Sequence, residues 1–272
     1  MAILRQNKRL RQREQGYRAQ LAAAERRFDD VLDALVPVSV ALLLERDFNR
    51  LLEKILLGAK ALCHADGGTL YLRTADDRLQ FAILHTDSLR LALGGSTGQP
   101  IPYEPVPLFD VSTGEPNHRN IAAYAALSGS TVNIADAYET AGFDFSGTRA
   151  FDRQTGYRST SLLTIPLKDG QGRVIGVIQL LNAQDPASGR VIPFESARQR
   201  VVEALAALAG VALEAYLREQ SLRQEIQQLR IEVDEARKER EAAEITATDS
   251  FRRLQERARA RRSRRGTPGE GT

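Results

Sequence analysis

Apolar residues recur in alternating steps of three and four at both ends of this 272-residue chain, over residues 3–35 and 222–243. This spacing constrains the fold more than any other feature of the sequence. It places the apolar side chains along one side of a helix, where they contribute stability only when a partner helix covers them. The pattern therefore predicts coiled-coil helices over residues 1–36 and 218–245. Pro37 is expected to end the first helix, because it has no backbone N–H to donate.

The segment between the two seams mixes helical and strand-like patterns. Helical periodicity covers residues 48–62, where Gly67-Gly68 is expected to close the helix, and returns from about Phe194. A short helix is expected over 120–127. Four apolar runs are typical of strands: 69–73, 79–84, 161–167 and 174–181.

Turn and loop signals separate these runs. The last two runs flank Asp169-Gly-Gln-Gly172, whose composition is typical of a hairpin turn, and Pro166 indicates a bulged or edge strand. Residues 94–117 and 140–156 are rich in Gly, Pro, Asp and Ser and are predicted to be loops. We therefore predict an α+β fold with a central antiparallel sheet flanked by helices.

Several classes of protein are excluded or disfavoured by composition. Cys63 is the only cysteine, so the chain has no intrachain disulfide and no cysteine-based metal cluster. The three histidines, His64, His85 and His118, are scattered, and we expect neither a metal nor a haem site. No apolar run approaches the roughly 18 residues of a membrane span, and no secretory signal is visible. We expect a cytoplasmic location and no covalent cofactor.

Positive charge is concentrated at the two ends of the chain. Residues 1–30 carry eight Lys/Arg against four Asp/Glu, whereas residues 31–216 carry 16 against 20. The acidic middle disfavours a central nucleic-acid-binding domain. The arginine-rich run Arg257–Arg265 suits nucleic acid or an acidic surface, but it has no interleaved aromatic residues. We favour a solvated short helix with a disordered tail over residues 246–272.

Three stretches carry a resemblance to a known family. They are STVNIADAY (residues 130–138), FDRQTGYRST (151–160) and LTIPLKDGQGRVIGVIQLLN (163–182). Together they make residues 46–217 resemble a GAF domain, most closely those of cyclic-nucleotide phosphodiesterases, bacterial adenylate cyclases and HD-type phosphodiesterases. The resemblance implies a GAF-like antiparallel sheet and, in many members of this group, a site for cAMP or cGMP.

The resemblance also implies where such a ligand would bind. The family helix that follows the long loop points its N-terminus at the phosphate, and here that helix begins near Ile121 and Ala122. The positions that contact base and sugar in the family fall on polar residues, namely Thr69, Asp152, Thr155, Ser159 and Gln179. Each of these residues also has an ordinary structural role open to it, such as capping a turn.

The sequence departs from the family pattern at one buried ion pair. Relatives carry Asn-Lys after the last strand, then Phe, then Asp-Glu. Here Asn182 and Phe194 are present, but Ala183 replaces the Lys and Arg198-Gln199 replaces the acidic pair. The ion pair cannot form, which implies a different ligand, affinity or locking mechanism. Neutral packing often substitutes for such a pair.

These observations predict a non-catalytic bacterial sensor that binds a small molecule, with a cyclic nucleotide as the best single guess. It would form a homodimer through its coiled coils and signal to an unidentified partner. One alternative is a GAF scaffold without ligand that acts through its coiled coils and arginine-rich tail. Another is an enzyme of the GAF-fold reductase type, which a single cysteine on a helix, Cys63, disfavours.

Overall fold

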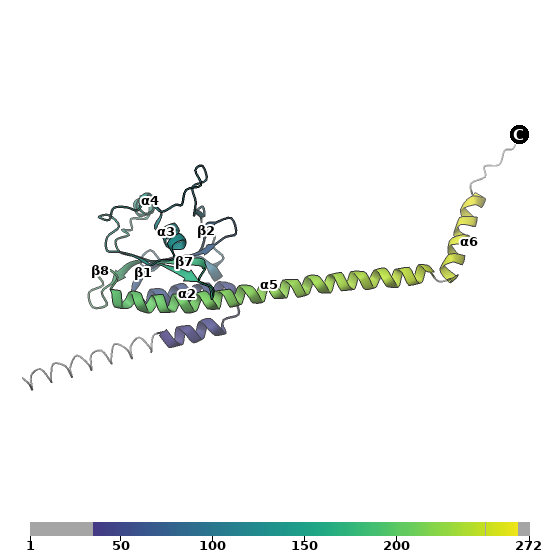
Figure 1. The fold of residues 1–272 in the computed structure, drawn as a ribbon, viewed down its shortest axis with the longest axis horizontal. Helices are drawn as coiled ribbons and strands as arrows, with labels where there is room; N and C mark the ends of the chain where they lie inside the picture. Colours follow the sequence, from purple (N-terminus) through teal and green to yellow (C-terminus); the bar gives the residue numbers. More distant parts are fainter. Residues whose placement is uncertain (1–34, 248, 266–272) are drawn as a thin grey trace, which may run out of the picture. The chain divides into compact units, whose positions relative to one another are not determined.

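The computed structural model describes residues 35–247 and 249–265, and the chain divides into two compact units, Met1–Tyr216 and Leu217–Thr272. Within the described residues, the first unit starts with a helix over residues 35–44, and it contains all the described strands (Figure 1). Its further elements are α2 (Phe48–Cys63), β1 (Ala65–Arg73), β2 (Arg78–Thr86), β3 (Leu91–Gly94), η1 (Gly95–Thr97), β4 (Val106–Pro107), α3 (Ile121–Ser128), β5 (Val132–Ile134), α4 (Ser146–Thr155), β6 (Leu162–Lys168), β7 (Val174–Gln184), β8 (Val191–Ile192) and the first part of α5 (Ser196–Ala247).

The strands form one antiparallel sheet, as the sequence predicts. Its order is β3-β2-β1-β7-β6-β5, while β4 adds to β2 and β8 adds to β7. The predicted hairpin is β6–β7. Pro166 faces Val177 of β7, and β5 pairs with β6 only as far as Thr164. At Pro166, therefore, β6 has a strand partner on only one side. On the other side, the missing N–H of the proline costs no hydrogen bond between strands.

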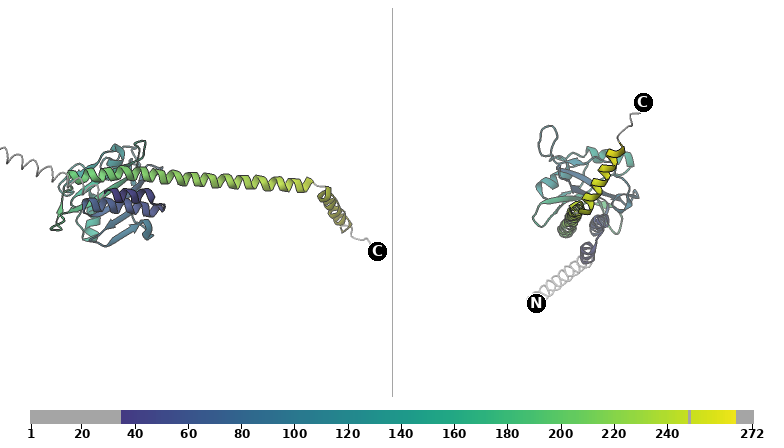
Figure 2. Two further views of the ribbon diagram at one scale, coloured as in Figure 1. Left: turned by 90° about the horizontal axis from the view of Figure 1, so that it is seen from below. Right: turned by 90° about the vertical axis from the view of Figure 1, so that its right-hand side faces the viewer.

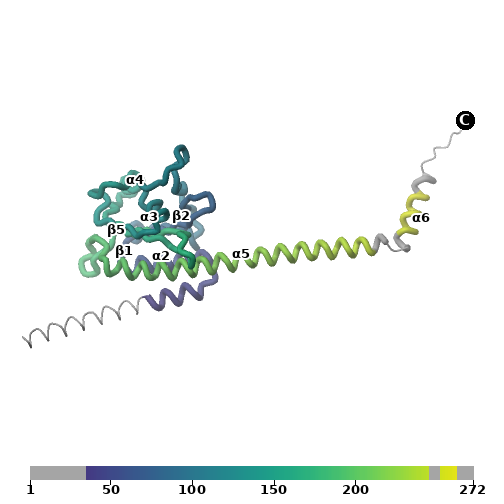
Figure 3. The backbone as a smooth tube through the Cα atoms, viewed as in Figure 1, coloured from purple at the N-terminus to yellow at the C-terminus, as the bar shows by residue number. Residues whose placement is uncertain are grey.

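Helices cover both faces of this sheet. In Figures 1 and 3, α2 and α5 lie on one face, whereas α3 and α4 lie on the other. Seen from below in Figure 2, α2 and the first part of α5 run side by side. A Cβ atom added at Gly58 of α2 would lie 3.6 Å from Leu205 of α5, so the two helices also touch.

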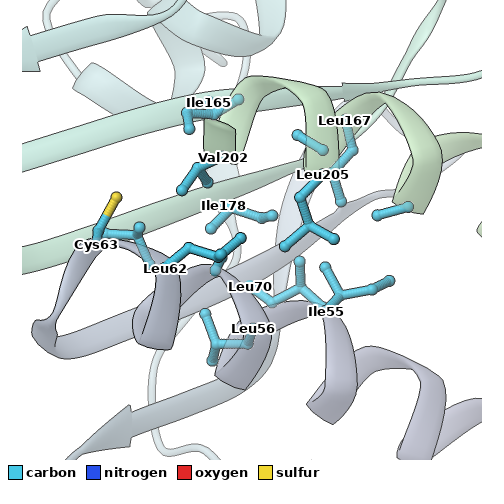
Figure 4. Packing of buried hydrophobic residues seen from close by; sticks show 14 of the residues in the cluster. Ile55, Leu56, Leu62, Cys63, Leu70, Ile165, Leu167, Ile178, Val202 and Leu205 are labelled. Atoms are coloured by element: carbon cyan, nitrogen blue, oxygen red, sulfur yellow. The ribbon is translucent and has the colours of Figure 1, made fainter. Parts of the chain in front are cut away.

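The main hydrophobic core lies between the sheet and these two helices (Figure 4). Ile55 and Leu56 of α2, Ile178 of β7 and Val202 and Leu205 of α5 are all completely buried. Burying one such side chain contributes about 1.5–3 kcal/mol relative to leaving it in water. The strand alternation sends Leu70 to this core and its neighbours Thr69 and Tyr71 to the opposite face.

The C-terminal end of α2 differs from the prediction. The helix ends at Cys63, and His64 adopts the left-handed conformation (φ 50°) while its N–H caps the carbonyls of Lys60 and Ala61. Gly67 and Gly68 instead belong to β1. A Cβ atom at Gly68 would lie 2.8 Å from Leu56 Cδ1, so this glycine lets α2 approach the sheet closely.

Two further expectations are corrected. Residues 35–44 are helical, so Pro37, which was expected to end a helix, lies within one. The predicted loop over 140–156 contains α4. Its tertiary contacts, described below, stabilise a segment that has little helical signal of its own. In contrast, α3 lies within one residue of the predicted bounds 120–127 at each end, with caps at Asn120 and Gly129.

The second unit is helical. It contains the rest of α5, which ends at Ala247, and α6 (Asp249–Arg265). Neither helix, nor any other in the described part of the chain, is long and apolar enough to cross a membrane. The coiled coil predicted over residues 1–36 falls almost wholly outside the described residues, as does the tail over 266–272.

Candidate ligand-binding site

A cavity of about 500 Å³ lies on the face of the sheet that carries α3 and α4. Strands β1, β2 and β7 contribute side chains to it, and so do the segments that lead into α3 and α4. Its lining residues are Thr69, Tyr71, Phe81, Leu84, Thr86, Tyr103, Glu104, Val106, Asn117, Arg119, Asn120, Ile121, Ala122, Asp144, Ser146, Gly147, Thr148, Phe151, Ser159, Gln179 and Leu181. A volume of this size suits a small organic ligand.

Polar side chains cross the middle of the sheet in one row. Thr69 of β1 pairs directly with Gln179 of β7, which in turn pairs with Thr164 of β6. The Gln179 side chain accepts a hydrogen bond from the Tyr71 hydroxyl (3.3 Å), and its Nε2 contacts Thr164 Oγ1 (3.3 Å). The carboxamide is thereby held in a fixed orientation. Thr69 and Gln179 therefore bring a hydroxyl and an amide group to the lining of the cavity.

Aromatic rings line the cavity beside this polar row. The rings of Tyr71 and Phe81 have centroids 4.7 Å apart, and Tyr103 lies 5.6 Å beyond Phe81. Phe151 adds a further ring from α4. A flat heterocycle would find apolar surface for stacking here.

The N-terminus of α3 also reaches the cavity, through Ile121 and Ala122. The Asn120 side-chain oxygen already accepts from the N–H groups of Ala122 (3.0 Å) and Ala123 (3.1 Å). This ordinary N-cap satisfies two of the donors that an anion would use. A phosphate that approached these two groups would therefore have to replace the Asn120 side chain.

Three charged side chains lie in the lining: Arg119, Glu104 and Asp144. Hydrogen bonds from Ser146, together with the charges of Arg119 and Arg149, hold the pKa of Asp144 below its ordinary value. Asp144 thus stays ionised and accepts a hydrogen bond from the Ser146 N–H at the start of α4. Arg119 is exposed and is the one cation among the lining residues, so it is the group that would meet an anionic ligand.

Asp152 and Thr155 lie outside the lining, which differs from the prediction. Asp152 is buried, and its oxygens accept from the Tyr138 hydroxyl (2.6 Å), the Ser159 N–H (2.8 Å) and the Ser159 hydroxyl (2.8 Å). Through these hydrogen bonds the Asp152 carboxylate links α4 to Ser159, in the segment that follows the helix. Thr155 is exposed and donates to the carbonyl of Phe151 at the end of α4.

The comparisons with known proteins bear on this architecture. The family model described as "GAF domain" matches residues 47–213, which is more than half of the chain. The chain belongs to the GAF domain family. GAF domains are typically regulatory domains that bind small molecules, and they are generally non-catalytic.

Relatives of this GAF domain include two groups of phosphodiesterases. The chain is 34% identical over 151 residues to "Dual 3',5'-cyclic-AMP and -GMP phosphodiesterase 11" of Drosophila melanogaster, a match that covers 51% of this chain and 9% of that protein. It is 29% identical over 140 residues to the "cGMP-specific 3',5'-cyclic phosphodiesterase" of Drosophila sechellia, with 51% and 11% covered. The chain spans about a tenth of the length of these relatives.

Solved structures agree on the fold. The GAF domain of a phosphoenolpyruvate-protein phosphotransferase from Coxiella burnetii superposes with a TM-score of 0.51 at 13% identity and covers 71% of this chain and 96% of that one. At this identity the likeness concerns the fold alone.

Where relatives of this GAF domain are expected to hold an ion pair, the structure has hydrogen bonds instead. Arg198 donates to the carbonyl of Leu62 (3.0 Å), and the Gln199 side chain accepts from Asn133 (2.9 Å). The Ala183 N–H donates to Ser161 Oγ, which donates to Ile192 (2.8 Å). The region is therefore closed by hydrogen bonds of guanidinium, amide and hydroxyl groups, which take the place of the ion pair.

Several lining residues of the GAF cavity were missed by sequence reasoning. Tyr71 and Phe81 could have been found, because alternation along β1 and β2 directs them to the same face as Thr69. Arg119 and Tyr103 lie in long loops without periodicity, so their placement depends on tertiary structure.

Cys63 does not add chemistry to this domain. The thiol is buried, and burial raises its pKa to about 12, so it stays protonated at neutral pH. Within the described residues no group of three or more His, Cys, Asp or Glu side chains is arranged to hold a metal ion.

Proposed function

We propose that this GAF protein is a non-catalytic sensor whose cavity binds a cyclic nucleotide and whose helices report occupancy to a partner protein. The observation that carries the proposal is the cavity itself. It combines a polar row on the sheet (Thr69, Gln179), an aromatic wall and one cation, Arg119, and these are the groups that a base and a phosphate require.

The proposed ligand lies with its base against the aromatic wall and its phosphate towards Arg119 and α3. The printed names of the relatives, phosphodiesterases acting on cAMP and cGMP, favour this ligand class over others of similar size. The amide of Gln179 and the hydroxyl of Thr69 then form hydrogen bonds with polar atoms at the edge of the ligand. Docking of the phosphate at α3 requires release of the Asn120 cap.

Isothermal titration of the full chain with cAMP and cGMP tests this function. We expect saturable binding of at least one nucleotide. Arg119→Gln should weaken binding about tenfold, because a charge-assisted hydrogen bond contributes about 1.5–3 kcal/mol and solvent retains part of it. Arg153→Gln is the matched control, since Arg153 is exposed on α4 outside the lining.

A second pair of variants separates the two classes of predicted residue. Thr69→Val removes a hydroxyl from the cavity and should weaken binding, whereas Thr155→Val lies outside the lining and should not. Absence of binding by both nucleotides, to protein shown by native mass spectrometry to carry no small molecule, would refute the ligand assignment. The scaffold alternative would then stand.

Signalling is proposed to occur through association of two copies. Many of the exposed large apolar side chains in the described part of the chain lie on helices, including Val40 and Leu43 before α2 and Leu222 and Ile226 on α5. Exposed apolar stripes on helices are typical of helix–helix contacts. Sedimentation equilibrium of the full chain measures the association directly.

A further inference from the structure

The second unit carries an uncovered apolar stripe on α5. Leu222, Ile226, Leu229 and Val233 are 52%, 52%, 53% and 67% exposed. All described side chains over residues 221–244 are exposed, so none of them covers this stripe. We call these four residues the zipper stripe.

The residue types of the zipper stripe favour two strands. In a heptad labelled a to g, Ile226 and Val233 occupy a, while Leu222 and Leu229 occupy d. Branched residues at a with leucine at d favour a parallel dimer over higher oligomers, because each shape fits the hole that the partner helix presents at that level.

The charged residues on either side of the stripe are sorted by sign. The three g positions carry glutamate, Glu225, Glu232 and Glu239. The three e positions carry arginine, Arg223, Arg230 and Arg237. One edge of the stripe is therefore acidic and the other is basic.

This sorting selects one orientation. In a parallel, in-register pair, each g residue faces the e residue five positions further along the second helix, which brings Glu225 to Arg230 and Glu232 to Arg237. In an antiparallel pair, g faces g and e faces e, so glutamates would face glutamates and arginines would face arginines. Only the parallel arrangement gives attractive contacts.

We infer that a second copy of this chain covers the zipper stripe as a parallel, in-register, two-stranded coiled coil. The inference rests on the proposed association of two copies and adds its orientation, register and strand number. Pairs within one helix compete only weakly: Arg237 lies 3.6 Å from Glu241 and 3.9 Å from Asp234, and all three side chains are exposed.

The heptad pattern also defines where the paired region ends. The next d position is Ala236 and the next a position is Arg240, so two guanidinium groups would meet there. Beyond it Glu239 would face Glu244 of the second copy. The paired region therefore covers residues 222–236.

Cysteine cross-linking tests the orientation. The native Cys63 is buried, so an introduced cysteine reports alone. Ala236→Cys places a thiol at d near one end of the stripe, where only a parallel, in-register pair brings two copies of the same position together. Gln224→Cys, on the outer f position, is the matched control. We expect mild oxidation to give covalent dimers of Ala236→Cys and almost none of Gln224→Cys.

The outcomes separate this inference from the proposed association. A chain that is monomeric by sedimentation at tens of micromolar overturns both. A chain that is dimeric but cross-links no better through Ala236→Cys than through Gln224→Cys overturns the parallel register alone. In an antiparallel pair d positions face a positions, so cross-linking of Ala236→Cys with Ile226→Cys in a mixture, in preference to self-cross-linking, would show antiparallel pairing.

Charge exchange supplies an independent readout. Glu232→Arg replaces two attractive contacts with two repulsive ones and should raise the dimer dissociation constant about tenfold. Adding Arg237→Glu restores opposite charges and should recover most of the loss. The difference should shrink in 1 M salt. Failure of the double variant to recover would contradict the predicted Glu232–Arg237 contact.

Discussion

A single buried lysine organises the end of β2. The Lys60 ammonium, on α2, is almost completely buried and lies 2.7 Å from His85 Nδ1 and 2.9 Å from Asp87 Oδ1. Because an ammonium group only donates, Nδ1 of His85 must be the acceptor, so this imidazole is neutral. Burial and the nearby Lys60 charge both lower the pKa of His85.

We therefore expect stability to depend on pH through His85. In the unfolded chain this histidine has its ordinary pKa, so the unfolded state binds more protons below about pH 6.5. The free energy of unfolding should fall as the pH drops from 7 towards 5. Thermal unfolding measured across this pH range should show that stability depends less steeply on pH in His85→Gln than in the native chain. An unchanged dependence would mean that another group, such as His64, causes it.

At the scale of elements, the success of sequence reasoning depends on whether the signal is local. The β6–β7 hairpin and helix α3 were predicted because their turn and cap residues lie within them, at Asp169 and at Asn120 and Gly129. Helix α4 was missed, because its sequence contains Gly, Ser and Thr and lacks an apolar stripe. It is fastened by contacts distant in sequence, such as Tyr138 to Asp152.

The same distinction applies to the site. Thr69, Gln179 and Asp152 were all assigned to the site by resemblance. Thr69 and Gln179 lie on strands, where alternation determines which face a side chain occupies, and both line the cavity. The carboxylate of Asp152 does not line the cavity. It accepts hydrogen bonds from Tyr138 and Ser159 instead. Arg119 reaches the cavity from a loop, and no local pattern in the sequence indicates that.

The contact of α5 with the β6–β7 turn gives an element-scale prediction. A Cβ atom at Gly210 of α5 would lie 2.0 Å from the carbonyl oxygen of Lys168, so the helix approaches the backbone closely there. Gly210→Ala should destabilise the fold by about 1–3 kcal/mol or more. Gly147→Ala on α4, where a Cβ meets nothing within 4 Å, should instead stabilise by about 0.5–1 kcal/mol. Chemical denaturation measures both, and equal effects would contradict the close approach.

At the scale of the whole molecule, the ligand site and the proposed pairing site draw on different parts of the sequence. The cavity uses the strands and loops of the first unit, whereas the zipper stripe lies in the second. Substitutions in the stripe should therefore leave nucleotide affinity per site unchanged in chains kept at equal oligomeric state. This independence makes the two proposals separately testable.

Assembly should respond to the residue that closes the paired region. Arg240→Leu replaces two facing guanidinium groups with an apolar pair and should tighten the dimer about tenfold or more, since burial of a leucine contributes about 1.5–3 kcal/mol. Sedimentation equilibrium measures the change. A weaker dimer in Arg240→Leu would contradict the assigned heptad.

In the proposed dimer, the facing Arg240 side chains would make association depend on the anions in solution. Two cations on a symmetry axis attract a counterion, and a divalent one neutralises both at once. At equal ionic strength, sulfate should therefore strengthen the native dimer more than chloride does. Part of this effect comes from the general salting-out of apolar surface, which Arg240→Leu retains. The excess in the native chain measures how far an anion, and not only a nucleotide, controls whether two copies stay together.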